Sequence, residues 1–557
     1  MLRASSRNTE QARARCYTGG VTEHPAARLT RLGVIDLGSN TGRLILCLRQ
    51  VHGIPLIVDE AQVSLRLAEG LQQSDAIGRP AVDRALVALR AFRVAAERFG
   101  VERLLAVGTS ALRDAANGAD VAGELQRESG VPIAVLSGEQ EAFYGYLAAA
   151  NSLPLRDGLV LDLGGGSLEL SFVRGRALER AISLPLGALR LHERFLRADP
   201  PTTGEIAALR QHVEAALHKA GVRKLAAGET LAGAGGTIRA LAKLVRKGSG
   251  APSIRLHGYT IDAVRLRELA RTLADQTAQQ RRRVPGLAPE RAEIIAAGAL
   301  IVQGVIQATG ARSLLVCGQG LREGLAYEAF RVRHRSAVIR NVRRAGIEAF
   351  RERYVTGALR AFTHESLDHD DDAGHAAPLY AGLRGPHPSD GVEPLALRLL
   401  EKLGPVASVS AADRELLEAA AALCDAGRAI SLYRWSEHAV YLLTNGDLNG
   451  YTQREAVLIG QLIAAQAGGR VEPPRGFAPL EAGAAFEVMA LALGLARWLR
   501  RFGVDAETPI SVLTPPGALL VVLPPDVPLI ADEWEEGLAR ACRRAFDREL
   551  RVTRVGD

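Results

Sequence analysis

Aromatic side chains are scarce in this sequence: Phe, Trp and Tyr together make up 4% of its 557 residues. Proteins that bind single-stranded nucleic acids stack bases on such rings, and the sequence also has no block of Lys and Arg that resembles a DNA-binding arm. We therefore expect no DNA partner. The formal net charge of +7 is spread over the whole length, so it suits an anionic ligand or serves solubility alone.

Cysteine is also rare, and no two cysteines form a C-x-x-C pair, which excludes zinc ribbons and thioredoxin-type motifs. The five lie far apart, at Cys16, Cys47, Cys317, Cys424 and Cys542. This usage indicates a reducing, cytoplasmic setting. No stretch of about 18 uncharged apolar residues occurs, so we expect no membrane span.

Two common glycine-rich phosphate loops are missing as well. No G-x-x-x-x-G-K-[S/T] segment occurs, which excludes a P-loop NTPase. The glycine turn at Gly233–Arg239 is not G-x-G-x-x-G, because Ile238 stands where the last glycine belongs. It leads into a predicted helix, so its N–H groups could still serve an anion.

Two short turns that are present organise the chain. One is Asp36-Leu-Gly-Ser-Asn-Thr-Gly42, and the other is Asp162-Leu-Gly-Gly-Gly-Ser-Leu-Glu169. Each follows an apolar run that predicts a buried strand, and each precedes a second strand-like run. The unit of strand, Asp-x-Gly turn and strand therefore occurs twice, which predicts two similar lobes that face each other.

The residue types in these turns suit a phosphate and a cation. Glycines let backbone N–H groups converge, Ser and Asn add donors, and an Asp at a strand end can bind Mg²⁺ directly or through water. A purely structural interpretation, two β-hairpins with glycine turns, explains one turn equally well. The repetition of the turn favours a binding site.

Further polar residues follow predicted strands. Thr109 and Ser110 are expected to cap a helix, and Arg113 is either a surface charge or a phosphate clamp. Ser137 is a predicted N-cap with Gln140 in capping-box register. Glutamates 139 and 141 either favour the start of that helix by their charge or carry chemistry.

The chain is long enough for three or four domains, and 47% apolar with 24% charged residues is typical of a globular protein. A helix-rich part follows the two lobes. We expect a disordered leader at 1–29, lobes at 30–148 and 149–330, a helical domain at 331–505 and a small α/β tail at 506–557. The His- and Asp-rich stretch at 364–375 resembles a metal cluster, but a solvated acidic loop is the preferred interpretation.

Seven motifs in one order resemble the exopolyphosphatase and guanosine pentaphosphate phosphatase (Ppx/GppA) family, over about residues 31–330. They are D-x-G-S-N at 36, T-S-A-L-R-D at 109, S-G-x-x-E-A at 137, D-x-G-G-G-S-x-E at 162, L-P-L-G-A-x-R at 184, G-G-T at 235 and C-G-Q-G-L-R-E-G at 317. The resemblance implies an α/β fold of two ribonuclease-H-like lobes, as in actin, sugar kinases and Hsp70, with a catalytic cleft between them. It also implies a mainly helical HD-like domain after the lobes and a homodimer.

Hydrolysis of a terminal phosphoanhydride needs donors for the phosphoryl oxygens, a cation and a base that activates water. The base is expected to be Glu141, the position to which the resemblance points, with Glu139 as its local rival. Asp36, Asp162 and Glu169 are the Mg²⁺ candidates, and Arg43 and Arg113 would neutralise phosphate charge. The expected phosphate-binding turns contribute Gly38, Ser39, Asn40, Gly164, Gly165, Gly166, Ser167, Gly235, Gly236 and Thr237.

Several functions fit these motifs. The preferred one is an exopolyphosphatase that releases orthophosphate from inorganic polyphosphate, and the alternative converts guanosine pentaphosphate to tetraphosphate. A sugar-kinase-like or actin-like ATP-binding protein is a more distant alternative, and a non-enzymatic polyphosphate sensor is the fallback. In the HD-like region Cys424 stands where the His of a His-Asp pair would be, so we expect a binding or dimerisation role there and no metal phosphohydrolase site.

Overall fold

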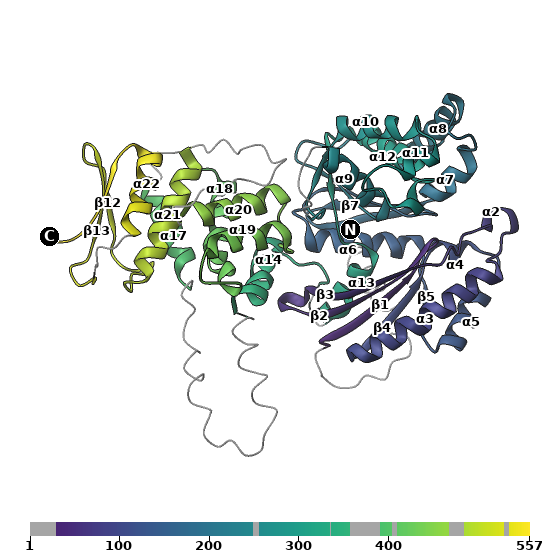
Figure 1. The fold of residues 1–557 in the computed structure, drawn as a ribbon, viewed down its shortest axis with the longest axis horizontal. Coiled ribbons are helices and arrows are strands. Elements are labelled where there is room, and N and C mark those ends of the chain that lie inside the picture. Colours follow the sequence, from purple (N-terminus) through teal and green to yellow (C-terminus); the bar gives the residue numbers. More distant parts are fainter. Residues whose placement is uncertain are drawn as a thin grey trace, which may run out of the picture.

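The computed structural model describes residues 29–248, 255–332, 334, 336–356, 390–403, 409–466, 484–528 and 534–556. The expected leader, except residue 29, and the His- and Asp-rich stretch at 364–375 lie outside these ranges. Within them, three sheets and their covering helices follow one another along the chain (Figure 1). No helix in the described part of the chain is long and apolar enough to cross a membrane.

The first lobe is built on a five-stranded sheet of order β3-β2-β1-β4-β5. Its helices α3 (Arg79–Phe99) and α5 (Gly118–Ser129) pack against each other beside the sheet. Helix α3 has Pro80 in its first turn and ends at Gly100, whose φ of 71° closes the helix without a Cβ penalty. The strands are β1 (Arg31–Leu37), β2 (Thr41–Arg49), β3 (Pro55–Ser64), β4 (Arg103–Gly108) and β5 (Ile133–Val135).

The second lobe repeats this plan in a six-stranded sheet of order β10-β11-β9-β6-β7-β8. In both lobes an antiparallel hairpin is followed by a parallel strand, β4 beside β1 and β9 beside β6. The strands are β6 (Gly158–Leu163), β7 (Leu168–Arg174), β8 (Ala177–Leu184), β9 (Thr230–Ala234), β10 (Thr260–Asp262) and β11 (Ser313–Val316). The main helices are α7 (Ala188–Phe195), α8 (Thr203–Lys219), α9 (Gly236–Gly248), α10 (Ala263–Ala274) and α12 (Ile295–Thr309).

Two helices join the lobes by packing across them. Helix α6 (Gly138–Ser152) follows the first lobe in sequence but contacts β6, β7 and β8 of the second. Helix α13 (Leu321–Arg331) ends the second lobe but contacts β1, β2 and β3 of the first, and it packs on α6. The expected boundary at residues 148 and 149 therefore falls inside α6. One buried cluster contains Leu32 and Val34 from β1 together with Leu325 and Phe330 from α13.

Helices dominate the chain after the lobes, as Figure 1 shows in green. They are α14 (Val342–Arg351), α17 (Val392–Leu403), α18 (Ala411–Leu423), α19 (Trp435–Asn445), α20 (Gln453–Gln466) and α21 (Ala484–Arg500). A small sheet of order β12-β13-β14 follows, made of β12 (Ser511–Leu513), β13 (Ala518–Leu523) and β14 (Glu549–Arg554), with α22 (Trp534–Phe546) beside it. One buried core includes residues from Ile347 to Cys542, so it continues across the expected boundary at 505 and 506.

Backbone hydrogen bonds fix the helical region to the second lobe. The N–H of Gly450 donates to the carbonyl of Ser152 over 2.8 Å, and that of Gln453 donates to Gly258 over 3.0 Å. The Asn449 amide donates to the Tyr327 hydroxyl over 3.0 Å. Because these groups are buried, separating the helical region from the second lobe would leave them without hydrogen-bond partners unless water replaced them.

Candidate active site

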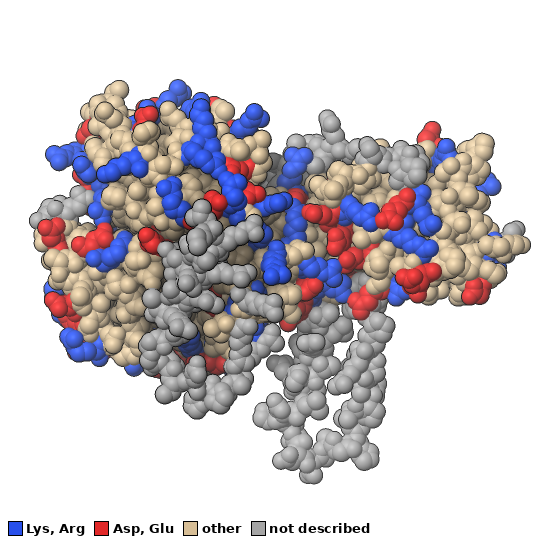
Figure 2. All heavy atoms as spheres, turned by 180° about the vertical axis from the view of Figure 1, so that it is seen from behind, with Lys and Arg blue, Asp and Glu red and all other residues tan. Residues whose placement is uncertain are grey.

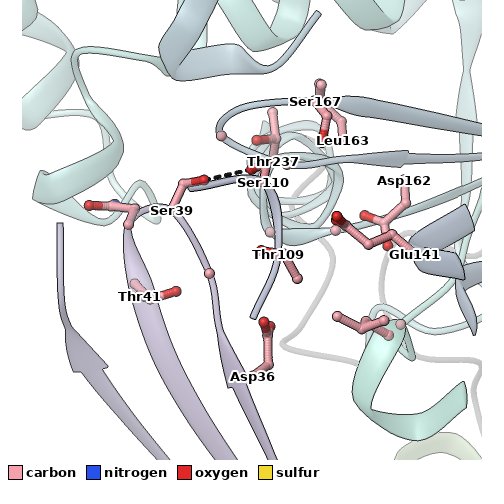
Figure 3. Close-up of a pocket in the computed structure, with 18 of the residues that line it drawn as sticks. Asp36, Ser39, Thr41, Thr109, Ser110, Glu141, Asp162, Leu163, Ser167 and Thr237 are labelled. Carbon is pink, nitrogen blue, oxygen red and sulfur yellow. Dashed lines mark hydrogen bonds between the residues drawn. The ribbon is translucent and has the colours of Figure 1, made fainter. Parts of the chain in front are cut away.

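A cavity of about 180 Å³ lies between the two lobes, and Figure 3 shows many of the side chains around it. Fourteen of the expected site residues line it, and two do not, Gly166 and Arg113. The fourteen are Asp36, Gly38, Ser39, Asn40, Arg43, Glu141, Asp162, Gly164, Gly165, Ser167, Glu169, Gly235, Gly236 and Thr237. The fold therefore gathers residues that are up to about 200 positions apart in the sequence at one place.

The two Asp-x-Gly turns close in the same way. The N–H of Gly38 donates to the carbonyl of Thr41 over 3.1 Å, and the N–H of Gly164 donates to that of Ser167 over 3.0 Å. These two N–H groups are thus committed to the hairpins, which corrects the expectation that they bind phosphate. The donors to an anion must come from the rest of each turn.

The start of helix α7 forms backbone hydrogen bonds with the second Asp-x-Gly turn. Backbone N–H groups of Ala188 and Leu189 donate to the carbonyls of Gly164 and Gly165 over 3.0 and 2.9 Å. A Cβ on Gly187 would lie 2.2 Å from the carbonyl oxygen of Gly165, so only glycine permits this approach. The turn is therefore rigid before any ligand arrives.

The third turn brings the start of α9 against the carboxylate of Asp162. Gly235 has a φ of +95°, and a Cβ there would lie 2.6 Å from Oδ1 of Asp162. A Cβ on Gly236 would lie 2.2 Å from a guanidinium nitrogen of Arg291. Close approach and a positive φ thus require glycine at 235, whereas at 236 a side chain would have to displace the Arg291 guanidinium. The positive end of the α9 dipole faces this part of the cavity wall.

Thr109 and Ser110 do not cap helix α4 (Ser110–Asp114) with their side chains, contrary to expectation. Thr109 occupies the N-cap position, but no side-chain hydrogen bond caps the helix. The Ser110 hydroxyl instead bonds the Ser39 hydroxyl over 2.7 Å, and both are buried (dashed in Figure 3). Both residues line the cavity.

Arg113 lies behind the cavity wall. Its guanidinium forms an ion pair with Glu141 and donates to the carbonyl of Leu136 over 3.0 Å. Glu141 itself lines the cavity, whereas Glu139, two residues away on α6, does not. Arg113 is therefore placed to hold Glu141, and the arginines that line the cavity are other ones.

Three arginines without an assigned role in the sequence join Arg43 in the cavity wall: Arg239, Arg291 and Arg322. The crowding is reflected in Arg43, whose pKa falls to about 10 because it is buried and because Arg239 and Arg322 lie near. Burial, together with Arg239, also lowers the pKa of Arg291. Positive charges brought together in this way favour a multiply charged anion between them.

Burial governs the carboxylates too. It raises the pKa of Asp162 to about 6, with Arg239 opposing, and raises the pKa of Asp36, with Arg322 and Arg43 opposing. The pKa values of Glu169 and Glu141 are also raised, by burial first, then by Asp162 for Glu169 and by Glu169 for Glu141. The positive charge of Arg113 opposes the rise in the pKa of Glu141, so the ion pair favours the ionised form of this carboxyl group.

The described residues contain no group of three or more His, Cys, Asp or Glu side chains arranged to hold a metal ion by themselves. Mg²⁺ nevertheless needs only one or two carboxylates, since it keeps several waters and takes substrate oxygens. Oδ1 of Asp36 is buried without a hydrogen-bond partner, and the partly buried Asp162 lines the same cavity. These carboxylates fit a hydrated cation.

Two family models match the chain. The one described as "Ppx/GppA phosphatase family" matches residues 46–332, and "Ppx/GppA phosphatase, domain III" matches residues 387–496. The chain belongs to the Ppx/GppA phosphatase family. The predicted resemblance is thereby confirmed, as is hydrolase chemistry at the level of a phosphatase.

Named relatives include both types of Ppx/GppA enzyme. The chain is 35% identical over 299 residues to Exopolyphosphatase 1 of Mycobacterium tuberculosis, which covers 53% of this chain and 87% of that protein. It is 28% identical over 435 residues to the guanosine-5'-triphosphate,3'-diphosphate pyrophosphatase of Vibrio cholerae, covering 77% and 79%. A solved exopolyphosphatase from Cytophaga hutchinsonii has a TM-score of 0.50 at 24% identity, covering 54% of this chain and 98% of that one, which shows the shared fold.

The position of the HD-like pair in this Ppx/GppA chain is a buried ion cluster. Asp425 accepts a hydrogen bond from Arg497 over 2.7 Å and pairs with Arg428 over 3.1 Å. Burial, followed by the Asp425 charge, raises the pKa of the Cys424 thiol to about 12. The guanidinium of Arg497 also lies 3.8 Å from the ring centroid of Trp435. Asp425 is therefore satisfied by cations of the chain itself.

Proposed function

We propose that this protein is an exopolyphosphatase that removes orthophosphate from the end of inorganic polyphosphate. The observation that carries the proposal is the composition of the cavity. Among the residues that the structure describes, its wall combines four arginines and five carboxylates with glycine turns and contains no aromatic side chain; Leu163, Ile294 and Leu321 are its apolar members. A wall of this kind suits a chain of phosphoryl groups, whose every unit carries negative charge.

The size of the cavity supports the same substrate. At about 180 Å³ it is smaller than the roughly 300–1,000 Å³ of sites that enclose drug-sized ligands. A small anionic end group fits such a space, with the rest of a polymer outside it. Figure 2 shows Lys and Arg side chains gathered over the second lobe and toward its junction with the helical region, where they would attract a polyanion.

In this mechanism the turns and arginines act on the phosphoryl oxygens. Donors from the two Asp-x-Gly turns and from the start of α9 bind the terminal phosphoryl group, and Arg43, Arg239, Arg291 and Arg322 offset its charge and that of the leaving chain. Because phosphoryl transfer has a loose transition state, positioning and charge stabilisation supply most of the acceleration.

Glu141 is the proposed base. As a buried carboxylate with a raised pKa, it binds a proton from the attacking water more readily than an exposed glutamate. Arg113 holds its side chain in one orientation. Glu139 is exposed and absent from the cavity wall, so it is a poor candidate.

The proposed cofactor is Mg²⁺, which Asp36 and Asp162 would hold, with Glu169 of the same cavity as a further candidate ligand. When bound, the cation neutralises charge on the phosphate chain. Three glycines surround the Asp162 carboxylate: a Cβ on Gly145, Gly235 or Gly320 would lie 3.5, 2.6 or 3.7 Å from one of its oxygens. The expected homodimer and cytoplasmic setting stay predictions from the sequence.

Hydrolysis of guanosine pentaphosphate is the competing function, because the Vibrio cholerae relative is matched along the helical region as well. Identity to the exopolyphosphatase is higher, and a guanine base would find no ring to stack on in this cavity wall. A nucleotide-binding role like that of sugar kinases is disfavoured for the same reason, because an adenine base would also lack a ring to stack on in this cavity wall.

Chain-length analysis tests the proposed activity. Purified full-length protein is incubated with long polyphosphate and Mg²⁺, and samples are analysed for orthophosphate and by gel electrophoresis. Release of orthophosphate from the first turnover, without short oligomers, is the expected result. Accumulation of oligomers would identify an endo-acting enzyme, and no hydrolysis by a protein that binds the polymer would favour the sensor.

A further inference from the structure

Arg190 of the second lobe reaches across to the first lobe. On helix α7, its Nη2 donates to Oδ2 of Asp114 over 2.6 Å, and its Nε donates to the carbonyl of Gly166 over 2.9 Å. One planar guanidinium thus spans the phosphate turn of its own lobe and a carboxylate of the other. The lobes touch at the same place, since a Cβ on Gly166 would lie 2.6 Å from the Ser110 hydroxyl.

Asp114 connects Arg190 to Glu141 through Arg113. Its second oxygen, Oδ1, pairs with Nε of Arg113 over 3.2 Å. Arg113 in turn binds Glu141 and the carbonyl of Leu136. An unbroken series therefore runs from the phosphate turn through Arg190, Asp114 and Arg113 to Glu141. All four side chains are at least partly buried, with exposed fractions of 33%, 35%, 24% and 11%.

We propose that Arg190 and Asp114 form an interlobe latch that positions Arg113, and through it Glu141, when the cleft is closed. Both are positioning residues. Opening of the cleft separates Arg190 from Asp114 because the two lie on different lobes, and Arg113 then loses the carboxylate that orients it. The active geometry would thereby depend on closure of the cleft. The inference rests on the proposed role of Glu141.

A double-mutant cycle in the full-length protein tests the latch. Arg190→Ala and Asp114→Ala are each expected to lower kcat about 10- to 100-fold, with KM changed by less than about threefold, because a misplaced base slows the chemical step more than binding. The double variant should be no slower than the slower single variant. Arg194→Ala is the matched control, since Arg194 lies on the same helix and stacks on its neighbour Phe195.

A conservative variant and a distance measurement separate positioning from folding. Arg190→Lys should recover little activity, because an ammonium cannot reach Asp114 and Gly166 together. Spin labels at Val94→Cys on α3 and Val264→Cys on α10, both exposed positions, report the distance between lobes in a Cys16→Ser background. Arg190→Ala should lengthen or broaden that distance distribution, and Arg194→Ala should leave it unchanged.

Two results would overturn the latch. One is Arg190→Ala matching Arg194→Ala in both kcat and interlobe distance, and the other is single-variant losses that multiply in the double variant. Failure of the proposed function is recognised separately. A fully active Glu141→Gln enzyme would remove the base assignment, while the label distances would still report whether Arg190 closes the lobes.

Discussion

The two lobes carry the same hairpin, with opposite charges at one equivalent position. In the first, Asp36 pairs with Arg43 across the hairpin, and in the second, Asp162 pairs with Glu169 at the equivalent register. Both turns close through the same backbone hydrogen bond. One backbone design therefore presents a cation on one side of the cavity and a second carboxylate on the other. We infer that the first hairpin contributes more to neutralising phosphate, through Arg43, and that the second contributes more to holding a metal ion, through Glu169.

Glu141 belongs to neither hairpin, and its loss should have the largest effect. Helix α6 presents it to the cavity from between the lobes. Glu141→Gln is expected to lower kcat about 100- to 10,000-fold while polyphosphate still binds, because only the base is removed. Rapid-quench assays and equilibrium binding measure the two effects. Glu139→Gln on the same helix is the control. An inactive Glu139→Gln enzyme together with an active Glu141→Gln enzyme would assign the base to Glu139 instead.

Arg43→Gln and Glu169→Gln should have different effects if the hairpins divide the work. Arg43→Gln is expected to raise KM about tenfold, through loss of a charge-assisted hydrogen bond to substrate. Glu169→Gln should instead raise the Mg²⁺ concentration needed for half-maximal rate. Steady-state titrations of substrate and of Mg²⁺ separate these outcomes. Identical phenotypes for the two variants would contradict the division.

The pH profile gives a second distinction between the same two positions. Glu141 must be deprotonated to act, so kcat should fall as pH falls through its pKa. Glu169 raises that pKa, and Glu169→Gln should therefore move the acid limb of kcat to lower pH. Arg43→Gln serves as the comparison because Arg43 is not among the largest influences on the pKa of Glu141. An unmoved acid limb in Glu169→Gln would assign the limb to another group.

The stability of the substrate-free protein should respond to charge in the same direction in both lobes. Folding raises the pKa of Asp162 from 3.8 to about 6, so its ionisation opposes folding fully above pH 6 and not at all well below 3.8. Asp162→Asn should therefore add up to about 3 kcal/mol to the free energy of unfolding at pH 8, less near pH 4. Asp36→Asn should also stabilise at pH 8. Thermal unfolding at both pH values measures this, and destabilisation by both variants would refute it.

The ion cluster in the helical region should matter for stability alone. Asp425→Asn leaves the buried Arg497 without its carboxylate, which typically costs about 3–5 kcal/mol. The kcat per folded molecule should remain that of the wild type. Denaturant unfolding and active-site titration measure the two quantities. A selective loss of kcat without loss of stability would show that this region contributes chemistry.

The hairpins could be predicted from sequence because their signals are local. An apolar run, an Asp-x-Gly turn and a second apolar run specify a hairpin wherever they occur, and β1–β2 and β6–β7 confirm both. The capping box of Ser137 and Gln140 is confirmed for the same reason. The actin-like fold was also foreseen, since seven ordered motifs fix a topology that no single one does.

The remaining site residues depend on tertiary contacts. Arg291 lies just before a buried helix with no motif around it, and only the close packing at Gly236 brings it to the cavity. Arg322 stands inside the motif at 317, and Arg239 ends the glycine turn at Gly233–Arg239, so the charge beside a glycine turn was the available signal for both. Ser110 leaves its expected capping role because Ser39 of the opposing turn lies within 2.7 Å. Local propensity cannot report a partner that folding brings from 71 residues away.

The ratio of two specificity constants tests the central claim most directly. Phosphate release by the full-length protein is measured in one Mg²⁺ buffer on long-chain polyphosphate and on guanosine pentaphosphate, with Glu141→Gln as the blank. The cavity of arginines and glycine turns, with no ring for a base, predicts a kcat/KM that strongly favours the polymer. A strong preference for the nucleotide would contradict the exopolyphosphatase assignment and would require a guanine site outside the cavity wall.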